Sequence, residues 1–220
     1  RVWIKIGKRG HGDDFTGASA VMEVLSFAGI PTMLFMDVPE QSMLKNFPEI
    51  QAFGVAGVAR SKDPEWMQEK LPSMFAALHQ FGAPILHYKT CSTFDSAPHI
   101  GSIGKATDLG HAVRHCDWIP LVVGAPKMGR YQAFGNLFAL SDDKIYRLDR
   151  HPVMSRHPVT PMDEADLGRH ISMQTQLPVG VVSLADMYAG KSAQALVRET
   201  QTGAKIVALD VIDDETLAEA

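Results

Sequence analysis

Short apolar runs along the chain alternate with longer segments of helical period. The runs are rich in β-branched residues and have the length of strands, and this alternation is typical of a mostly parallel sheet flanked by helices. We therefore predict an α/β fold. The predicted strands are Val2–Ile6, Thr32–Phe35, Phe53–Val58, Ile85–Tyr88, Ile119–Val123, Val179–Ser183 and Ile206–Leu209.

Three segments between these strands are expected to be helices, and two of them have an amphipathic pattern. Apolar residues recur three or four positions apart over residues 18–25 and again over residues 67–78, including Met74, which places them on one helix face. Asp63 followed by Pro64 predicts the start of the second helix, because aspartate caps free N–H groups and proline suits the first helical position. A third helix is expected over residues 105–115, after a glycine-rich loop.

The stretch from Gly124 to Pro161 departs from this alternation and is rich in Gly, Pro, Arg and His. Within it, "GNLFAL" and "KIYRL" have the pattern of short strands in a hairpin. We therefore predict a small β excursion near residues 124–160. Met154 and Met162 are expected to be packing residues.

Composition limits the classes of partner. The chain has 220 residues, 45% of them hydrophobic, and a net charge of −4 with nine histidines, so no basic stripe recommends nucleic acid or a membrane surface. No run approaches the ~18 apolar residues that span a bilayer, and the N-terminal segment lacks the apolar stretch of a signal peptide. Cys91 and Cys116 form no disulfide framework, which fits a reducing compartment. We expect a cytoplasmic protein with a small-molecule partner.

Two adjacent aspartates, Asp13 and Asp14 in "GHGDDFTGAS", precede the first predicted helix. Neighbouring side chains on an extended segment point to opposite sides, so one carboxylate can face a ligand. The other can cap the helix by accepting from backbone N–H groups, and capping alone is the alternative interpretation of the pair.

Further polar side chains follow two predicted strands, where open α/β sheets bind ligands. A guanidinium group matches a carboxylate or phosphate in bidentate geometry, although a surface ion pair also explains an arginine. A turn satisfied by its own side chains would explain the second loop, but a lysine and a carboxylate among hydroxyls favour a ligand. The candidates are Arg60 and Ser61 in "ARS", and Lys89, Ser92, Thr93 and Asp95 in "YKTCSTFDS".

Two more candidates lie in the Gly- and Pro-rich stretch. Arg130 belongs to "GAPKMGR", and His157 belongs to a proline-stiffened loop that also carries His151. The spacing of the two histidines is a poor metal signature, so contacts with a substrate or another domain are expected. The chain has no G-x-x-x-x-G-K-[ST] motif, and "GSIGK" is too short to serve as a phosphate loop.

Taken in order, these motifs resemble those of a known family. "DDFTGA", "ARS", "KTCSTFDS", "GR", "HPVTPM", "DEADL" and the tail "ALDVIDDETLAEA" occur as they do in the N-terminal half of the four-carbon acid sugar kinases. The resemblance covers nearly the whole chain. It implies an ATP-dependent kinase acting on threonate, erythronate or 3-oxo-tetronate, with ATP and Mg²⁺ bound mainly by a C-terminal nucleotide-binding domain.

The resemblance implies that residues 1–220 form one sugar-acid-binding N-terminal domain, with the ATP-binding domain outside this chain. A sugar acid needs a cation for its carboxylate, for which Arg60 and Lys89 are the expected choices. Its hydroxyls would be bound by Ser92, Thr93 and Asp95, and Ser61 would be a further substrate contact. Arg130 and His157 would complete the site or contact the ATP-binding domain. The expected proton acceptor is Asp14, with Asp13 in reserve.

Two other functions remain open at this point. One is a Mg²⁺-dependent phosphatase or hydrolase in which Asp13 or Asp14 attacks the substrate or binds the metal. The other is a non-catalytic module that binds a sugar acid. The sequence also leaves a homo-oligomer open.

Overall fold

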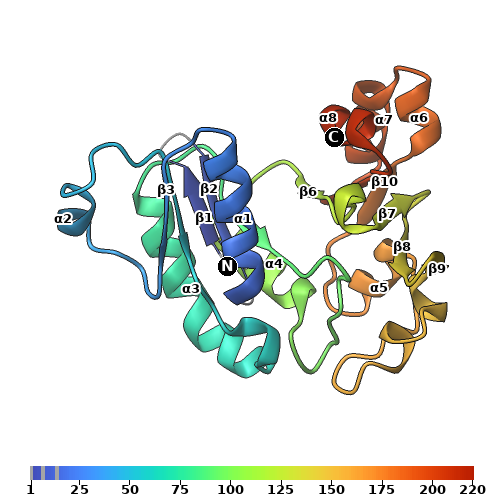
Figure 1. Cartoon of the computed structure of the whole chain (residues 1–220), viewed down its shortest axis with the longest axis horizontal. Helices are drawn as coiled ribbons and strands as arrows, with labels where there is room; N and C mark the ends of the chain where they lie inside the picture. Colours follow the sequence, from blue (N-terminus) through green and yellow to red (C-terminus); the bar gives the residue numbers. More distant parts are fainter. Residues whose placement is uncertain (1, 6–7, 13–14) are drawn as a thin grey trace. The chain divides into compact units, whose positions relative to one another are not determined.

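The computed structural model describes the backbone of residues 2–5, 8–12 and 15–220, and side chains from residue 17 on. The chain forms two compact units (Figure 1). Residues 92–114 contribute to both units, because the chain passes between them several times in this segment. Unit 1 contains Arg1–Cys91, His99–Ser102 and Leu109–Arg114, and unit 2 contains Ser92–Pro98, Ile103–Asp108 and His115–Ala220.

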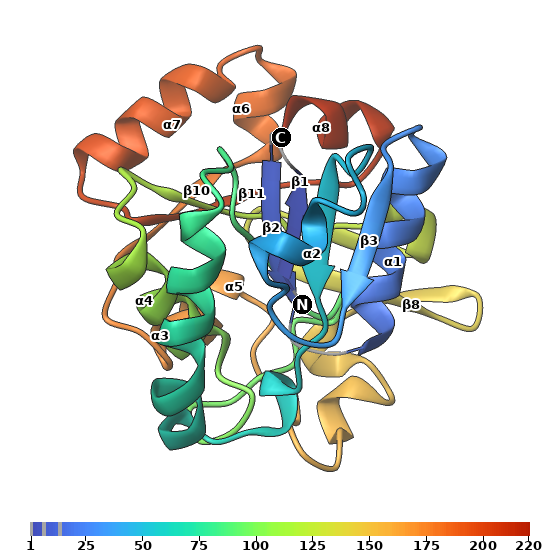
Figure 2. The same cartoon turned by 90° about the vertical axis from the view of Figure 1, so that its left-hand side faces the viewer.

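Unit 1 is built on a five-stranded sheet with the order β2-β5-β1-β4-β3. Helices α1 and α3 lie on opposite faces of this sheet (Figure 2). The strands are β1 (Val2–Lys5), β2 (Lys8–Gly12), β3 (Thr32–Phe35), β4 (Ala52–Val55) and β5 (His87–Lys89), and the helices are α1 (Phe15–Phe27), α2 (Gln41–Leu44), α3 (Pro64–Gln80) and α4 (Ile103–Val113), the last shared with unit 2.

The predicted α/β class is confirmed, with one local departure from a parallel sheet. β3 pairs with β4 in parallel, as expected, and β2, a strand that was not predicted, pairs with β5 in parallel. β1, however, runs antiparallel to β2, β4 and β5. The polar residues of β2 form a strand through backbone pairing with β1, and a hydrophobic pattern carries no signal for such pairing.

Helix α3 follows its predicted signals closely. The Asp63 Oδ1 atom accepts a hydrogen bond from the Trp66 backbone N–H at 2.7 Å, and Pro64 occupies the first helical position. The one difference is on the apolar face, where Phe75 is buried instead of the predicted Met74 and meets Tyr88 of β5 edge to face. Each such buried side chain stabilises the fold by roughly 1.5–3 kcal/mol. The buried face consists of Met67, Leu71, Phe75 and Leu78.

Unit 2 contains a parallel sheet with the order β10-β11-β6. Alternate residues of β11 face two different clusters. Ile206 and Ala208 belong to the larger cluster around Phe94, which we call the main core. Val207 and Leu209 pack in a smaller cluster with Ala195 of α7. This alternation is the signature of a sheet buried on both faces. The elements are β6 (Ile119–Leu121), β10 (Val179–Val182), β11 (Ile206–Leu209), α5 (Leu167–Ser172), α6 (Leu184–Tyr188), α7 (Ser192–Gln201) and α8 (Asp214–Glu219).

The predicted β excursion is confirmed as a three-stranded antiparallel sheet of β7 (Arg130–Ala133), β8 (Asn136–Ser141) and β9 (Lys144–Arg147). Met154 and Met162 are buried, as predicted. The β7–β8 turn is tied to the parallel sheet by Asp210, whose carboxylate accepts from Phe134 N at 2.5 Å and Gly135 N at 3.0 Å. Full burial raises the pKa of Asp210, and these N–H donors oppose that shift.

Among the described residues, no helix combines the length and the apolar character that crossing a bilayer requires.

Gly101 provides a test of the packing in unit 1. It has a φ of +61°, and a Cβ atom there would lie 2.5 Å from the backbone oxygen of Arg60. Gly29 has a similar φ of +73° but open space around it. Gly29→Ala should lower the free energy of unfolding by about 1 kcal/mol, the cost of a positive φ for a residue with a Cβ atom. Gly101→Ala should lower it by at least about 2 kcal/mol more, because its Cβ atom would also clash with Arg60. Urea unfolding measures both, and equal losses would contradict the close approach.

Helix α6 provides a test by pH. Hydrogen bonds from Ser183 lower the pKa of Asp186, and Arg198 of α7 contributes to the shift through an ion pair at 3.3 Å. A carboxylate with a lowered folded pKa adds stability above its unfolded value near ~3.9, and this stability is lost as the pH falls through the folded value. Asp186→Asn should flatten the acid limb of stability against pH, as measured by thermal unfolding from pH 6 to 2.5. An unchanged acid limb would contradict this assignment.

Candidate functional site

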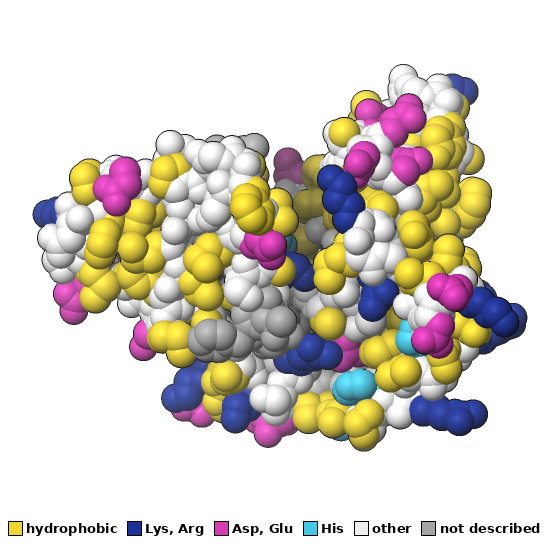
Figure 3. Space-filling view, in the orientation of Figure 1, with side chains coloured by type: hydrophobic (Ala, Val, Ile, Leu, Met, Phe, Trp, Pro, Cys, Tyr) yellow, Lys and Arg dark blue, Asp and Glu magenta, His cyan; other side chains and the backbone are white. Residues whose placement is uncertain are grey.

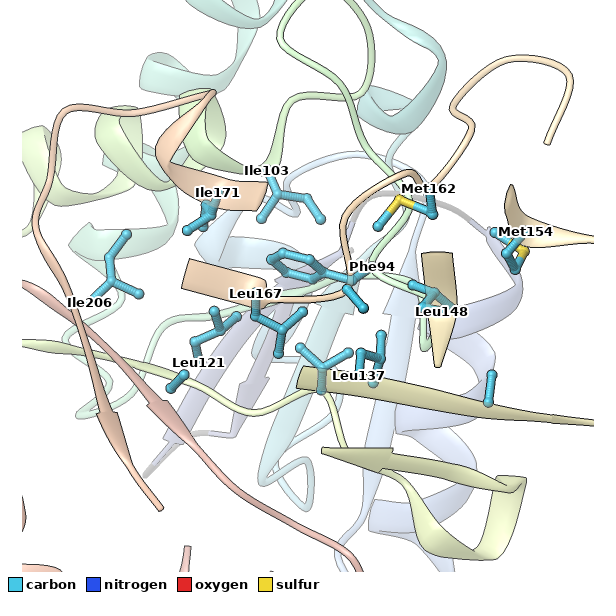
Figure 4. Close-up of a cluster of buried hydrophobic side chains, with 14 residues drawn as sticks. Phe94, Ile103, Leu121, Leu137, Leu148, Met154, Met162, Leu167, Ile171 and Ile206 are labelled. Carbon is cyan, nitrogen blue, oxygen red and sulfur yellow. The ribbon is translucent and has the colours of Figure 1, made fainter. Parts of the chain in front are cut away.

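The loop that carries the motif "CSTFDS" is anchored by Phe94. This residue has a φ of +52° and is fully buried, although non-glycine residues rarely adopt positive φ. Figure 4 shows its ring inside the main core, near Leu167, Met162 and Ile103. Packing of the ring therefore holds the loop in a strained conformation, which is a common feature of functional sites.

Next to Phe94, the carboxylate of Asp95 is buried and is 1% exposed. Its Oδ1 atom accepts from the Thr93 hydroxyl at 2.5 Å, and its Oδ2 atom accepts from the Thr160 hydroxyl at 3.2 Å. The Thr160 backbone N–H donates to Nδ1 of His157 at 3.1 Å. Buried charge is tolerated only with such hydrogen bonds. We call Thr93, Asp95, His157 and Thr160 the Asp95 cluster.

A second network fixes the other side of the loop. The Ser96 hydroxyl lies 3.0 Å from Nε2 of His170 and accepts from the Gln174 amide at 2.9 Å. The Gly104 N–H at the start of α4 donates to Oε1 of Gln174 at 3.2 Å, which orients that amide. Burial lowers the pKa of His170, so its ring is neutral near pH 7, and its Nδ1 atom is buried with no hydrogen-bond partner among the described residues. This network holds the backbone that carries Asp95.

The predicted residues of unit 1 lie at two strand ends. Arg60 and Ser61 form a short 3₁₀ turn after β4, and the Ser61 hydroxyl donates to Val58 O at 3.0 Å. Gly101 packs against this turn and donates its N–H to the Lys62 carbonyl at 2.8 Å. The ammonium group of Lys89, at the end of β5, donates to the carbonyl of Thr90. The hydroxyl of Ser61 therefore stabilises its own turn.

The remaining predicted residues differ in their surroundings. Ser92 is half-buried. Arg130 directs Nη1 at the carbonyls of Met128 and Gly129, at 3.1 and 3.2 Å, so part of its guanidinium stabilises its own turn. Asp13 and Asp14 lie outside the described residues. Unit 2 thus brings together Thr93, Asp95 and His157, while the ligand roles of all the predicted residues stay predictions.

Sequence reasoning missed three residues of these networks. Thr160 lies inside "HPVTPM", so the motif marked the segment without identifying the hydroxyl that contacts Asp95. His170 and Gln174 lie on and just after α5, in a stretch with no recognisable motif. Their contacts with Ser96 join positions 74 and 78 residues apart. Only the fold reveals such pairs.

The cluster contains side-chain types that bind hydroxyl groups, and Thr93, Asp95 and Thr160 are buried. It combines a carboxylate, two threonine hydroxyls and an imidazole, all of which exchange hydrogen bonds with alcohols. The described residues contain no group of three or more His, Cys, Asp or Glu side chains placed to hold a metal ion. On the face shown in Figure 3, basic and acidic side chains are interspersed, without a basic stripe for a polyanion.

Comparisons with known proteins agree with this chemistry. A family model described as a sugar-binding N-terminal domain matches residues 11–220. A protein of Paraburkholderia graminis named 3-oxo-isoapionate kinase is 48% identical over 212 residues, which cover 96% of this chain and 45% of that protein. A 3-oxo-tetronate kinase of Methylobacterium radiotolerans is 33% identical over 219 residues, covering 93% of this chain and 47% of that protein.

The fold agrees as well. A crystal structure of a Haemophilus influenzae protein superposes with a TM-score of 0.84 at 29% identity, covering 96% of this chain and 50% of that one. The chain spans about half the length of the curated relatives that it matches.

Thr160→Val tests the Asp95 cluster without a ligand. The substitution keeps the shape of the side chain but leaves the buried carboxylate one donor short, so we expect a loss of about 1–3 kcal/mol in unfolding free energy. Thr160→Ser keeps the donor and should cost less. Thr107→Val, which removes a hydroxyl that donates to the Ile103 carbonyl of its own helix, is the matched control. Both losses of unfolding free energy are measured by urea unfolding. Equal losses for Thr160→Val and Thr107→Val would contradict the hydrogen bond from Thr160 to Asp95.

Proposed function

Because the chain belongs to the family of sugar-binding N-terminal domains, we propose that it binds the acceptor substrate of an ATP-dependent kinase. The resemblance to the four-carbon acid sugar kinases, read from the sequence motifs, is thereby confirmed at the level of the family. The proposed substrate is a small acid with several hydroxyl groups. The two kinase relatives are named for 3-oxo-isoapionate and 3-oxo-tetronate, so a 3-oxo acid is the first choice, and threonate and erythronate follow.

The observation that carries the proposal is the Asp95 cluster in a chain of this family. A carboxylate that is 1% exposed and bonded by two threonine hydroxyls is held rigidly, because each oxygen has a defined donor. Rigid acceptors next to hydroxyls discriminate alcohol positions on a small ligand better than flexible surface groups do. We propose that Thr93, Asp95 and Thr160 bind hydroxyls of the substrate.

The substrate carboxylate requires a cation. Arg60 and Lys89 are the proposed partners, because a guanidinium binds a carboxylate through two parallel hydrogen bonds and an ammonium adds a compact charge. Ser61, Ser92 and Arg130 are proposed as supporting contacts. Asp14, with Asp13 in reserve, is the proposed acceptor for the proton of the attacking hydroxyl.

ATP would supply the phosphoryl group, and Mg²⁺ would offset its negative charge. The described residues offer neither a phosphate-binding glycine loop nor a metal cluster. We therefore propose that a C-terminal nucleotide-binding domain holds both and that this chain, as one domain, contributes the substrate contacts. The proposed location is the cytoplasm, where ATP and small acids are available.

Calorimetric titration of the chain with 3-oxo-tetronate, threonate and erythronate tests the proposal. We expect saturable binding of at least one acid, weakened at least about 30-fold by Arg60→Ala and about tenfold by Asp95→Asn. Arg169→Ala, which removes an exposed arginine paired loosely with Asp166 at 3.9 Å, is the control for net charge. A folded chain that binds none of the acids would contradict the proposal.

Two further results would point to the other functions. Release of phosphate from a phosphorylated acid by this chain would favour a hydrolase. Binding without ATP-dependent turnover, after a nucleotide-binding domain is supplied, would favour a non-catalytic module.

A further inference from the structure

The side chain of Gln174 is fixed by the first turn of α4. The Gly104 N–H donates to Oε1 of Gln174 at 3.2 Å, and a Cβ atom at position 104 would lie only 2.5 Å from the Cβ atom of Gln174. Only glycine permits this close approach, so the amide has little room to turn away. Because a backbone N–H can only donate, the amide atom that faces it is the oxygen.

The orientation of this amide determines the protonation of His170. The Gln174 nitrogen lies 2.9 Å from the Ser96 hydroxyl and 3.1 Å from Nε2 of His170, and an amide nitrogen only donates. Nε2 therefore accepts and carries no proton, and the ring proton lies on Nδ1. This proton has no acceptor among the described residues in the neutral ring or in the charged one, so the contacts of Nε2 distinguish the two forms.

Ser96 connects this amide and imidazole to Asp95. Its hydroxyl accepts from Gln174 and donates to the carbonyl of Phe94 at 3.1 Å, so it joins the residues on both sides of Asp95. Ser96 is 1% exposed and His170 is 2% exposed, and the ring of His170 also meets Phe94 edge to face. The backbone of Asp95 is therefore held through a hydroxyl that depends on the state of one ring nitrogen.

A proton on Nε2 would disrupt this arrangement. Nε2–H and the amide N–H would then be two donors 3.1 Å apart, and the amide cannot turn without losing its bond to the start of α4. The negative charges of Asp163, Glu164 and Asp95 favour the charged ring, but burial outweighs them and lowers the pKa of His170. The hydrogen bonds and the burial of the ring thus favour the same neutral form.

We propose that His170 is a positioning residue that holds Asp95, through Ser96, in the conformation that binds the sugar acid, and does so only while Nε2 carries no proton. The inference rests on the proposed function of the Asp95 cluster. Ligand binding and protonation of His170 then oppose each other, and such coupling is reciprocal. Low pH must weaken binding, and the ligand must lower the pKa of His170. An anionic ligand acting through its charge alone would raise that pKa, so the sign of the change identifies the coupling.

Nuclear magnetic resonance of the imidazole ¹⁵N nuclei tests both steps in the wild-type chain. Without ligand, the proton of the neutral His170 ring should lie on Nδ1, and a proton on Nε2 would overturn the inference. Addition of threonate or 3-oxo-tetronate, whichever binds more tightly, should lower the pKa of His170. An unchanged or raised pKa would also overturn it.

His170→Gln removes the titrating group and keeps an acceptor, because its amide oxygen can replace Nε2. Calorimetric titration with the same acid should show the wild-type affinity falling at least about threefold from pH 7.5 to pH 4.5, and the affinity of His170→Gln changing less than about 1.5-fold. His151→Gln is the matched control, since His151 is also buried and its Nδ1 accepts the Met154 N–H at 3.1 Å. It should keep the wild-type dependence on pH. Circular dichroism at both pH values confirms that each protein is folded.

The outcomes distinguish this inference from the function on which it rests. If wild-type protein binds no sugar acid at either pH, the proposed function fails and the inference fails with it. If wild-type protein binds equally well at both pH values, or if His170→Gln keeps the wild-type dependence on pH, His170 only packs the loop and the inference alone fails. Should His170→Gln fail to fold, the resonance measurement on the wild-type chain decides.

Discussion

The burial of Phe94 is the constraint on which the candidate site depends. Its positive φ costs free energy, and the hydrophobic gain from a ring enclosed by the main core offsets that cost. Because the ring fixes the backbone between Thr93 and Asp95, the polar side chains on either side have defined directions. The Asp95 cluster and the Ser96 network are both consequences of this one apolar contact.

Much of the fold was predictable because its signals are local. The strands Thr32–Phe35 and Ile206–Leu209 have the predicted bounds, since each is a short apolar run between turn residues. The β8–β9 hairpin and the Asp63 cap were also predictable. The polar strand β2 was not, because its pairing with β1 depends on backbone hydrogen bonds between the two strands. Phe75 takes the place of Met74 on the buried face of α3 and contacts Tyr88, a pairing between segments that the helical period does not reveal.

The candidate site also contains residues that the sequence marked and residues that only the fold brings together. Thr93, Asp95 and His157 carried a chemical signal in their own segments and were predictable as candidates. Thr160 contacts Asp95 across 65 positions, and Gln174 contacts Ser96 across 78, so no local pattern joins them. Chemistry that resides in one segment can be predicted, whereas chemistry shared between segments requires the fold.

The contacts of Asp210 constrain the order in which unit 2 can fold during synthesis. The carboxylate of Asp210 accepts a hydrogen bond from the Gly135 N–H, which lies 75 residues earlier in the chain. The β7–β8 turn is therefore synthesised long before the carboxylate that holds it. Until β11 has been synthesised, the turn has its hairpin bonds and the bond from the Leu167 N–H to the Gly135 carbonyl, and the parallel sheet lacks its central strand. Contacts of such sequence separation form late and slowly. The hydrogen bonds from the turn to Asp210 can therefore form only after β11 has been made.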